Sequence, residues 1–309
     1  MTRLHAVRPA TLAVLAATLS LAACNQSPSP SGKLLVIASF YPLYEFAREV
    51  AGPAAQVVSL VPPGVEPHDW EPSPQDLARI RDARIFIYNG AGLEPWVPKL
   101  LGEATSPGTV MVRVTDGVPL LAPEADAHGS GQVPPADPHV WLDPVLAQSI
   151  VERIRVAFVQ VDPAHAALFD DNARALTGKL QNLHEAFATG LERCARREIV
   201  TSHAAAAYLA RRYRLRVVPV MGLVPDAEPT PAQLAAIVRF AREKKVKYIF
   251  FETLVSARLA ETLAREIGAH TLVFNPIEGV TPEEAAAGRG YVALMEQNLR
   301  NLRTALECA

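Results

Sequence analysis

From Lys33 onward, short apolar runs rich in β-branched residues alternate with stretches of helical periodicity. The runs cover residues 34–39, 56–61, 85–88 and 110–114 in the first half, and 198–201, 216–220, 248–251 and 271–274 in the second. Several are apolar at every position, which is typical of strands buried on both faces of a parallel sheet. Strands that alternate with helices pair in parallel through right-handed crossovers. The pattern therefore predicts an α/β fold with two four-stranded parallel sheets.

Three helix starts are marked by a hydroxyl residue followed by proline. Ser73, Thr230 and Thr281 each precede a proline, with an acid or amide two residues further on. The hydroxyl can accept a hydrogen bond from a free amide of the first turn, and the proline presets the helical φ angle. We expect a helix to begin at each of these positions.

The segment 162–194 is predicted to form one long helix between the two halves. Apolar residues recur in it at steps of four, three, four and four, as Leu176, Leu180, Leu183, Phe187 and Leu191. About thirty helical residues would extend roughly 45 Å. We expect this helix to join a domain of residues 33–161 rigidly to a domain of residues 195–309 and to limit hinge motion. Two helices broken near Thr177-Gly178 are the alternative.

Composition and charge fit a globular chain of one or two domains. Of the 309 residues, 50% are hydrophobic and 20% are charged, and the net charge is -2 with no long basic or acidic run. This balance points to no nucleic-acid partner.

The first 24 residues have the organisation of a secretion signal. Two arginines precede an apolar stretch, residues 10–22, that is short for a bilayer span. The motif Leu21-Ala22-Ala23-Cys24 resembles the bacterial lipobox, in which cleavage leaves a lipidated cysteine, and residues 25–32 form a polar tether. We expect an exported protein, in the periplasm or at the cell surface, anchored to the membrane by lipid on Cys24. An ordinary signal peptide that contains a cysteine is the alternative.

The two other cysteines, Cys194 and Cys308, lie at the ends of the long helix and of the last predicted helix. No Cys-x-x-Cys pair is present, so neither a thiolate zinc site nor a redox dithiol is supported. Export permits a disulfide between Cys194 and Cys308, but sequence alone leaves their separation open.

Three of the eight histidines follow predicted strands. His68 comes after the second strand, His139 after the fourth, and His203 directly after the first strand of the second half. In open α/β sheets, ligands bind in the crevice at the carboxyl ends of the strands. Glu278 follows the fourth strand of the second half, as the counterpart of His139. Three imidazoles and one carboxylate between two such edges suit a zinc ion in the cleft between the domains.

A lone histidine is more often structural than metal-ligating, so the common placement of the three carries this hypothesis. No His-Glu-x-x-His motif occurs, which disfavours a helix-borne zinc protease site. Nearby carboxylates are candidates to accept the second ring N–H of a ligating imidazole, namely Asp69, Glu71, Asp137 and Asp143. Asp143 is better explained as a helix cap before Pro144. Trp70 and Trp141 either wall the site against water or pack the domain interface.

Several motifs resemble those of a known family. They are Ala-Ser-Phe-Tyr-Pro-Leu from residue 38, Val-Glu-Pro-His-Asp-Trp-Glu-Pro around His68, Asp-Pro-His-Val-Trp-Leu-Asp-Pro around His139, Thr-Ser-His-Ala-Ala-Ala-Ala-Tyr-Leu around His203, and Tyr-Val-Ala-Leu-Met-Glu-Gln-Asn-Leu from residue 291. The chain resembles, over nearly all of residues 33–309, the ZnuA-like and TroA-like lipoproteins that bind zinc or manganese for ABC importers.

This resemblance implies metal ligands at His68, His139 and His203, with Glu278 as the fourth ligand of the zinc type. It implies a membrane permease as partner, and a monomer is expected. An adhesin role is often attached to the family. The chain departs from many zinc members in its loop of residues 119–136, which is short and has His128 as its one histidine. A metal-gathering role for that loop is therefore not expected.

Manganese or iron delivery is the competing function within the same transporter class, and a zinc hydrolase is the competing function outside it. A hydrolase keeps an open metal position for water. Glu278 as a fourth ligand closes that position, so we expect a binding protein and not an enzyme.

Overall fold

The computed structural model describes residues 33–103, 108–123, 135–225 and 229–309 of the chain. The predicted signal peptide with Cys24, the tether of residues 25–32, and His128 lie outside the described residues. Among the helices of the described part, none is both long and apolar enough to cross a membrane.

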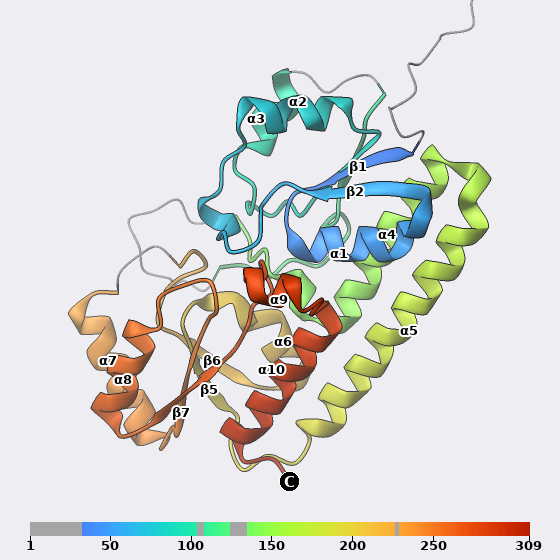
Figure 1. The fold of residues 1–309 in the computed structure, drawn as a ribbon. Coiled ribbons are helices and arrows are strands. Elements are labelled where there is room, and N and C mark those ends of the chain that lie inside the picture. Colours follow the sequence, from blue (N-terminus) through green and yellow to red (C-terminus); the bar gives the residue numbers. More distant parts are fainter. Residues whose placement is uncertain (1–32, 104–107, 124–134, 226–228) are drawn as a thin grey trace, which may run out of the picture. The chain divides into compact units, whose positions relative to one another are not determined.

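Two four-stranded parallel sheets form the framework (Figure 1). The first has the order β2-β1-β3-β4, from strands β1 (Leu34–Ala38), β2 (Ala55–Ser59), β3 (Ile85–Tyr88) and β4 (Val110–Arg113). The second has the order β6-β5-β7-β8, from strands β5 (Glu198–Thr201), β6 (Arg216–Pro219), β7 (Tyr248–Phe251) and β8 (His270–Val273). The predicted α/β fold with two parallel sheets is confirmed.

Helices connect the strands within each half and between them. They are α1 (Tyr41–Ala51), α2 (Pro74–Asp82), α3 (Val97–Glu103), α4 (Pro144–Val161), α5 (Ala166–Gly190), α6 (Ala207–Tyr213), α7 (Pro231–Glu243), α8 (Arg258–Ile267), α9 (Pro282–Ala286) and α10 (Tyr291–Leu306). The predicted starts of α2, α7 and α9 are confirmed. At each start, the hydroxyl of Ser73, Thr230 or Thr281 accepts from the backbone amide of the residue three positions further on. The side chain of that later residue accepts in return from the backbone amide of the serine or threonine.

The long helix is shorter than predicted, because α5 covers 25 residues, or about 37 Å. Pro163 belongs to a separate 3₁₀ turn, Pro163–His165, and the helix ends at Gly190. It does not break at Thr177-Gly178, and the leucines on either side of that point are buried in the apolar core. α5 contacts α1 and α4 of the first half and α10 of the second (Figure 1).

One apolar core extends through both halves. It contains Val36 and Ile85 of the first sheet, Ile199 and Phe250 of the second, and buried residues of α5 such as Phe187. Residues 33–309 accordingly form one compact unit. The finer boundaries at 161, 162–194 and 195 remain a prediction.

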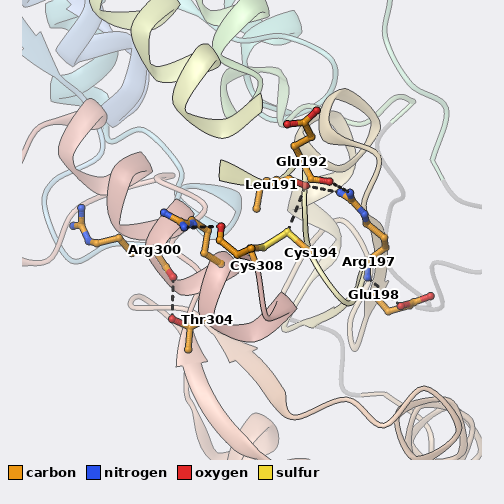
Figure 2. Close-up of a disulfide and its surroundings, with 10 residues drawn as sticks. Leu191, Glu192, Cys194, Arg197, Glu198, Arg300, Thr304 and Cys308 are labelled. Carbon is orange, nitrogen blue, oxygen red and sulfur yellow. Dashed lines mark hydrogen bonds between the residues drawn. A yellow bond between two sulfur atoms is a disulfide. The ribbon is translucent and has the colours of Figure 1, made fainter. Parts of the chain in front are cut away.

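A disulfide joins Cys194 to Cys308, with an S–S distance of 1.97 Å across 114 residues of sequence (Figure 2). It ties the segment that follows α5 to the chain end that follows α10. Beside it, the guanidinium of Arg197 donates to the carbonyls of Leu191 (2.7 Å) and Glu192 (2.6 Å), which satisfies acceptors beyond the end of α5.

Candidate metal centre

The structure brings His68, His139, His203 and Glu278 together between the two sheets. One ligand-type atom from each lies within 4.8 Å of those from the others. These residues come from four different connections, separated by up to 210 residues of sequence.

Local backbone bonds orient each of these connections. His68 lies in a 3₁₀ turn, Pro67–Asp69, capped by the Glu66 carboxylate, which accepts from the His68 amide at 3.3 Å. The Asp137 carboxylate accepts from the His139 amide at 2.9 Å, and the Thr201 hydroxyl donates to the His203 carbonyl at 2.8 Å.

Glu278 is aimed by an unusual backbone conformation of the residue before it. Ile277 has φ of 58°, which a β-branched residue rarely adopts, and it is fully buried. Asn275 stabilises this turn because its side-chain oxygen accepts from the Ile277 amide at 2.8 Å. Asn298 of α10 in turn donates to the Asn275 carbonyl and accepts from its amide. Such strain persists only where surrounding bonds determine it, and it is common at functional sites.

Four separations within the group are close to those between ligands of a tetrahedral ion. Glu278 Oε1 lies 2.9 Å from His139 Nε2, 3.2 Å from His203 Nε2 and 3.4 Å from His68 Nε2. The Nε2 atoms of His139 and His203 are 3.3 Å apart. Zinc bonds of about 2.05 Å in tetrahedral geometry separate neighbouring ligand atoms by about 3.3 Å. These four separations, of 2.9–3.4 Å, are close to that value, and all four ligand atoms lie within 4.8 Å of one another.

The group is sealed from solvent. The His139 and His203 side chains are 0% exposed, that of Glu278 is 1% exposed and that of His68 is 3% exposed. Glu278 Oε2 is buried and has no hydrogen-bond partner among the described residues. A buried carboxylate oxygen without a partner is costly, and a cation at this position would remove that cost.

Two carboxylates fix the orientation of two of the imidazoles. Asp137 Oδ1 lies 2.8 Å from His139 Nδ1, and Glu252 Oε1 lies 2.7 Å from His203 Nδ1. In the neutral ring, an Nδ1–H that donates to the carboxylate leaves the Nε2 lone pair available to an ion at the centre. Glu252 was missed by the sequence reasoning, although it directly follows β7 at the same sheet edge.

The protonation of the site reflects burial and these carboxylates. Burial lowers the pKa of His68 below its ordinary value. Burial acts the same way on His203, but the charges of Glu252 and Glu278 outweigh it and raise the His203 pKa well above the usual range. Burial also lowers the pKa of His139, but Asp137 and Glu278 together outweigh burial and raise that pKa above its ordinary value. Burial opposes ionisation of Glu278, but the nearby histidines, His203 foremost, hold its pKa well below the usual range.

The other candidate residues have different roles. Asp143 accepts from the Val145 amide at 2.9 Å and so caps α4, as expected. Asp69 and Glu71 are exposed, and among the described residues neither is hydrogen-bonded to a histidine of the site. Trp141 is fully buried with its ring 5.3 Å from that of His139, so it walls the site.

Trp70 packs instead against Trp96, with ring centroids 5.8 Å apart, at the edge of the first half's smaller core.

A cavity of about 930 Å³ borders His68 and Asp69, and a second, of about 520 Å³, borders Glu278. Each cavity is lined by one residue of the group, and the His139 and His203 side chains line neither.

The fold and site define a class of α/β protein that holds three imidazoles and one carboxylate between two parallel sheets. A family model described as zinc-uptake complex component A, periplasmic, matches residues 36–305. The chain belongs to this family.

Known proteins similar to the chain agree with this membership. The high-affinity zinc uptake system protein ZnuA of Bacillus subtilis is 40% identical over 305 residues, which cover 95% of this chain and 96% of that protein. The zinc-binding lipoprotein AdcA of Streptococcus pneumoniae is 41% identical over 291 residues, covering 92% of this chain but 58% of AdcA.

Two solved structures extend the likeness. The Zn(II)-bound ZnuA-like domain of Streptococcus pneumoniae AdcA matches with a TM-score of 0.78 and 41% identity, over 89% of this chain and 100% of that domain. The laminin-binding protein Lmb of Streptococcus agalactiae, described as a bifunctional protein with adhesin and metal transporting activity, matches with a TM-score of 0.80 and 28% identity, over 89% of this chain and 99% of that chain.

Proposed function

We propose that this protein captures Zn²⁺ outside the cytoplasmic membrane and delivers it to the permease of an ABC import system. The observation that carries the proposal is the buried group of His68, His139, His203 and Glu278, whose ligand atoms lie within 4.8 Å of one another. Membership of the zinc-uptake family and the likeness to a Zn(II)-bound domain support the proposal.

The donor set favours zinc over manganese. Imidazole nitrogens suit zinc, whereas manganese prefers carboxylate, carbonyl and water oxygens in octahedral sites. Three of the four donors are nitrogens, and the group is too buried to admit several waters. Delivery of manganese or iron is therefore the weaker alternative.

The same closure argues for binding and not for catalysis. A catalytic zinc site has three protein ligands and an open position for water or substrate. With Glu278 in the fourth position, a bound ion has no place for an attacking water. We infer that the protein is a binding protein and not a hydrolase.

The proposal extends to the location of the protein. The signal and the lipobox cysteine support export and a lipid anchor on Cys24, and the disulfide between Cys194 and Cys308 fits an oxidising compartment. We infer a monomer with domains at residues 33–161 and 195–309 and a linking helix within residues 162–194.

Calorimetric titration of the protein, purified without added metal, tests the proposal. We expect zinc to bind more tightly than manganese. His68→Ala, His139→Ala and His203→Ala should each weaken zinc binding by more than about 100-fold, the upper end of what loss of an outer carboxylate costs. Glu278→Ala should cost less, because water can replace the carboxylate.

His165→Ala is the matched control, since His165 is exposed and bonded to Asp162 at 2.7 Å away from the site. His128→Ala should also leave affinity unchanged. Full-strength zinc binding by any of the three histidine variants, or tighter binding of manganese than of zinc, would refute the assignment.

Adhesion is a second candidate function, favoured by the likeness to the laminin-binding protein Lmb. Surface plasmon resonance with immobilised laminin tests it. Absence of saturable binding by the zinc-loaded protein would remove this candidate and leave zinc delivery untouched.

A further inference from the structure

The segment that carries His139 is bonded to the second half of the chain as well as to the first. It leads into α4, which packs on α1, β3 and β4. Trp141 Nε1, however, donates to the Pro276 carbonyl at 2.7 Å, and the Tyr291 hydroxyl donates to the Trp141 carbonyl. Pro276 is two residues from Glu278, and Trp141 is two residues from His139. The bond between Trp141 and Pro276 therefore joins two segments that carry site residues.

Helix α6 makes a second connection to the same segment. It begins four residues after His203, and two of its side chains reach toward residues 137–143. Arg212 pairs with the Asp143 carboxylate at 2.8 Å. The Tyr208 hydroxyl donates to the Asp137 carbonyl at 2.9 Å and accepts from the Leu121 amide at 2.9 Å.

Tyr208 is the residue of α6 that bonds next to a site histidine's carboxylate partner. Its side chain is only 3% exposed, so its hydroxyl bonds are shielded from water. It bonds the backbone of Asp137, the residue whose carboxylate holds His139 Nδ1 at 2.8 Å. A short series of bonds therefore runs from the helix behind His203 through Tyr208 and Asp137 to His139.

We propose that Tyr208 is a positioning residue for the metal centre, whose hydroxyl holds the Asp137–His139 pair in place relative to His203. Its role is to keep the two Nε2 atoms at their separation of 3.3 Å before the ion arrives. A ligand set that is already ordered binds more tightly, because binding does not have to order it. The inference rests on the proposed function, since it takes His139 and His203 as ligands.

Tyr208→Phe tests this role because it removes the hydroxyl and keeps the ring. Tyr213→Phe is the matched control. Tyr213 lies on the same helix, is 7% exposed, and has its hydroxyl 3.1 Å from His184 Nδ1 of α5, away from the centre. A residue that only packs the core would give the same result in both variants.

The zinc dissociation rate, measured by stopped flow into excess chelator, is the main readout. We expect Tyr208→Phe to raise this rate about tenfold, the effect of one net hydrogen bond, and Tyr213→Phe to leave it unchanged. The visible spectrum of the Co²⁺-loaded protein, which reports ligand geometry, should change in Tyr208→Phe alone. Because dissociation starts from the loaded form, the rate is measurable even if the metal-free variant is unfolded.

A dissociation rate in Tyr208→Phe within twofold of the unmodified protein would overturn the inference, as would equal effects in the two variants. Weak zinc binding by the unmodified protein is a different outcome, since it would refute the proposed function itself.

Discussion

Glu252 offers a sharp test of how the centre is organised. It contacts His203 but is not one of the four proposed metal ligands. Its Oε1 lies 2.7 Å from His203 Nδ1 and accepts from the His203 amide at 3.2 Å. The residue is 4% exposed, so water cannot readily replace it. Removal of the carboxylate leaves a buried ring N–H and a buried amide without their acceptor.

The expected magnitude follows from these two bonds. Loss of a carboxylate that orients a metal-bound histidine typically costs 10–100-fold in metal affinity, or about 1.4–2.7 kcal/mol. Glu252→Gln retains the shape and one acceptor oxygen but loses the charge, so we expect about a tenfold loss. Glu252→Ala loses both bonds, and we expect about 100-fold.

Competition against a chelating fluorophore measures the zinc Kd of each variant. Glu94→Gln is the matched control, because Glu94 is a similarly buried carboxylate that accepts from Ser39 (2.6 Å) and the Asn89 amide (2.8 Å) instead of from a site histidine. We expect the control to lower thermal stability and to leave the Kd unchanged. Unaltered zinc affinity in Glu252→Ala, or an equal loss in Glu94→Gln, would refute the reasoning.

Further predictions concern pH, the disulfide, the anchor and motion. Because the pKa of His203 is raised well above 6.5, zinc affinity should begin to fall at a pH above 6.5 as the pH is lowered. The expected fall is about tenfold per pH unit for each proton that zinc displaces, measured in titrations across pH 5–9. A constant Kd from pH 8 to pH 6 would contradict this. In the metal-free protein the same raised pKa contributes stability below pH 6.5 that is lost as pH rises through the folded-state value, which thermal melts should detect. A double Cys194→Ser, Cys308→Ser variant should lose about 4–5 kcal/mol of unfolding free energy in denaturant titrations, because the disulfide closes a loop across 114 residues. Its zinc Kd should stay the same. Equal stability would show that the disulfide contributes nothing. Cys24→Ser should move the protein from the membrane to the soluble fraction, and unchanged retention would exclude the lipid anchor. X-ray scattering profiles with and without zinc should nearly coincide, and a large fall in radius of gyration would exclude a rigid linking helix.

Local features of the chain were predictable because local physics decides them. Short apolar runs rich in β-branched residues identified all eight described strands, and the proline-capped starts of α2, α7 and α9 followed from the hydroxyl at each cap. The long helix was predicted in kind but not in length, since Pro163 nucleates a separate turn and α5 ends at Gly190. Helix ends depend on which carbonyls find partners, and here the Arg197 guanidinium takes the carbonyls of Leu191 and Glu192.

The sequence by itself determined the two parallel sheets and the positions of His68, His139, His203 and Glu278 after their strands, because strand periodicity and the crossover rule both act along the chain. Only the tertiary structure decided which side chains orient these four. Asp137 lies two residues from His139, whereas Glu252 is 49 residues from the histidine that it holds, and Tyr208 is 71 residues from Asp137. Contacts at such separations depend on how β5 pairs with β7 and on how α6 packs against the first half, and no local pattern in the chain encodes that packing.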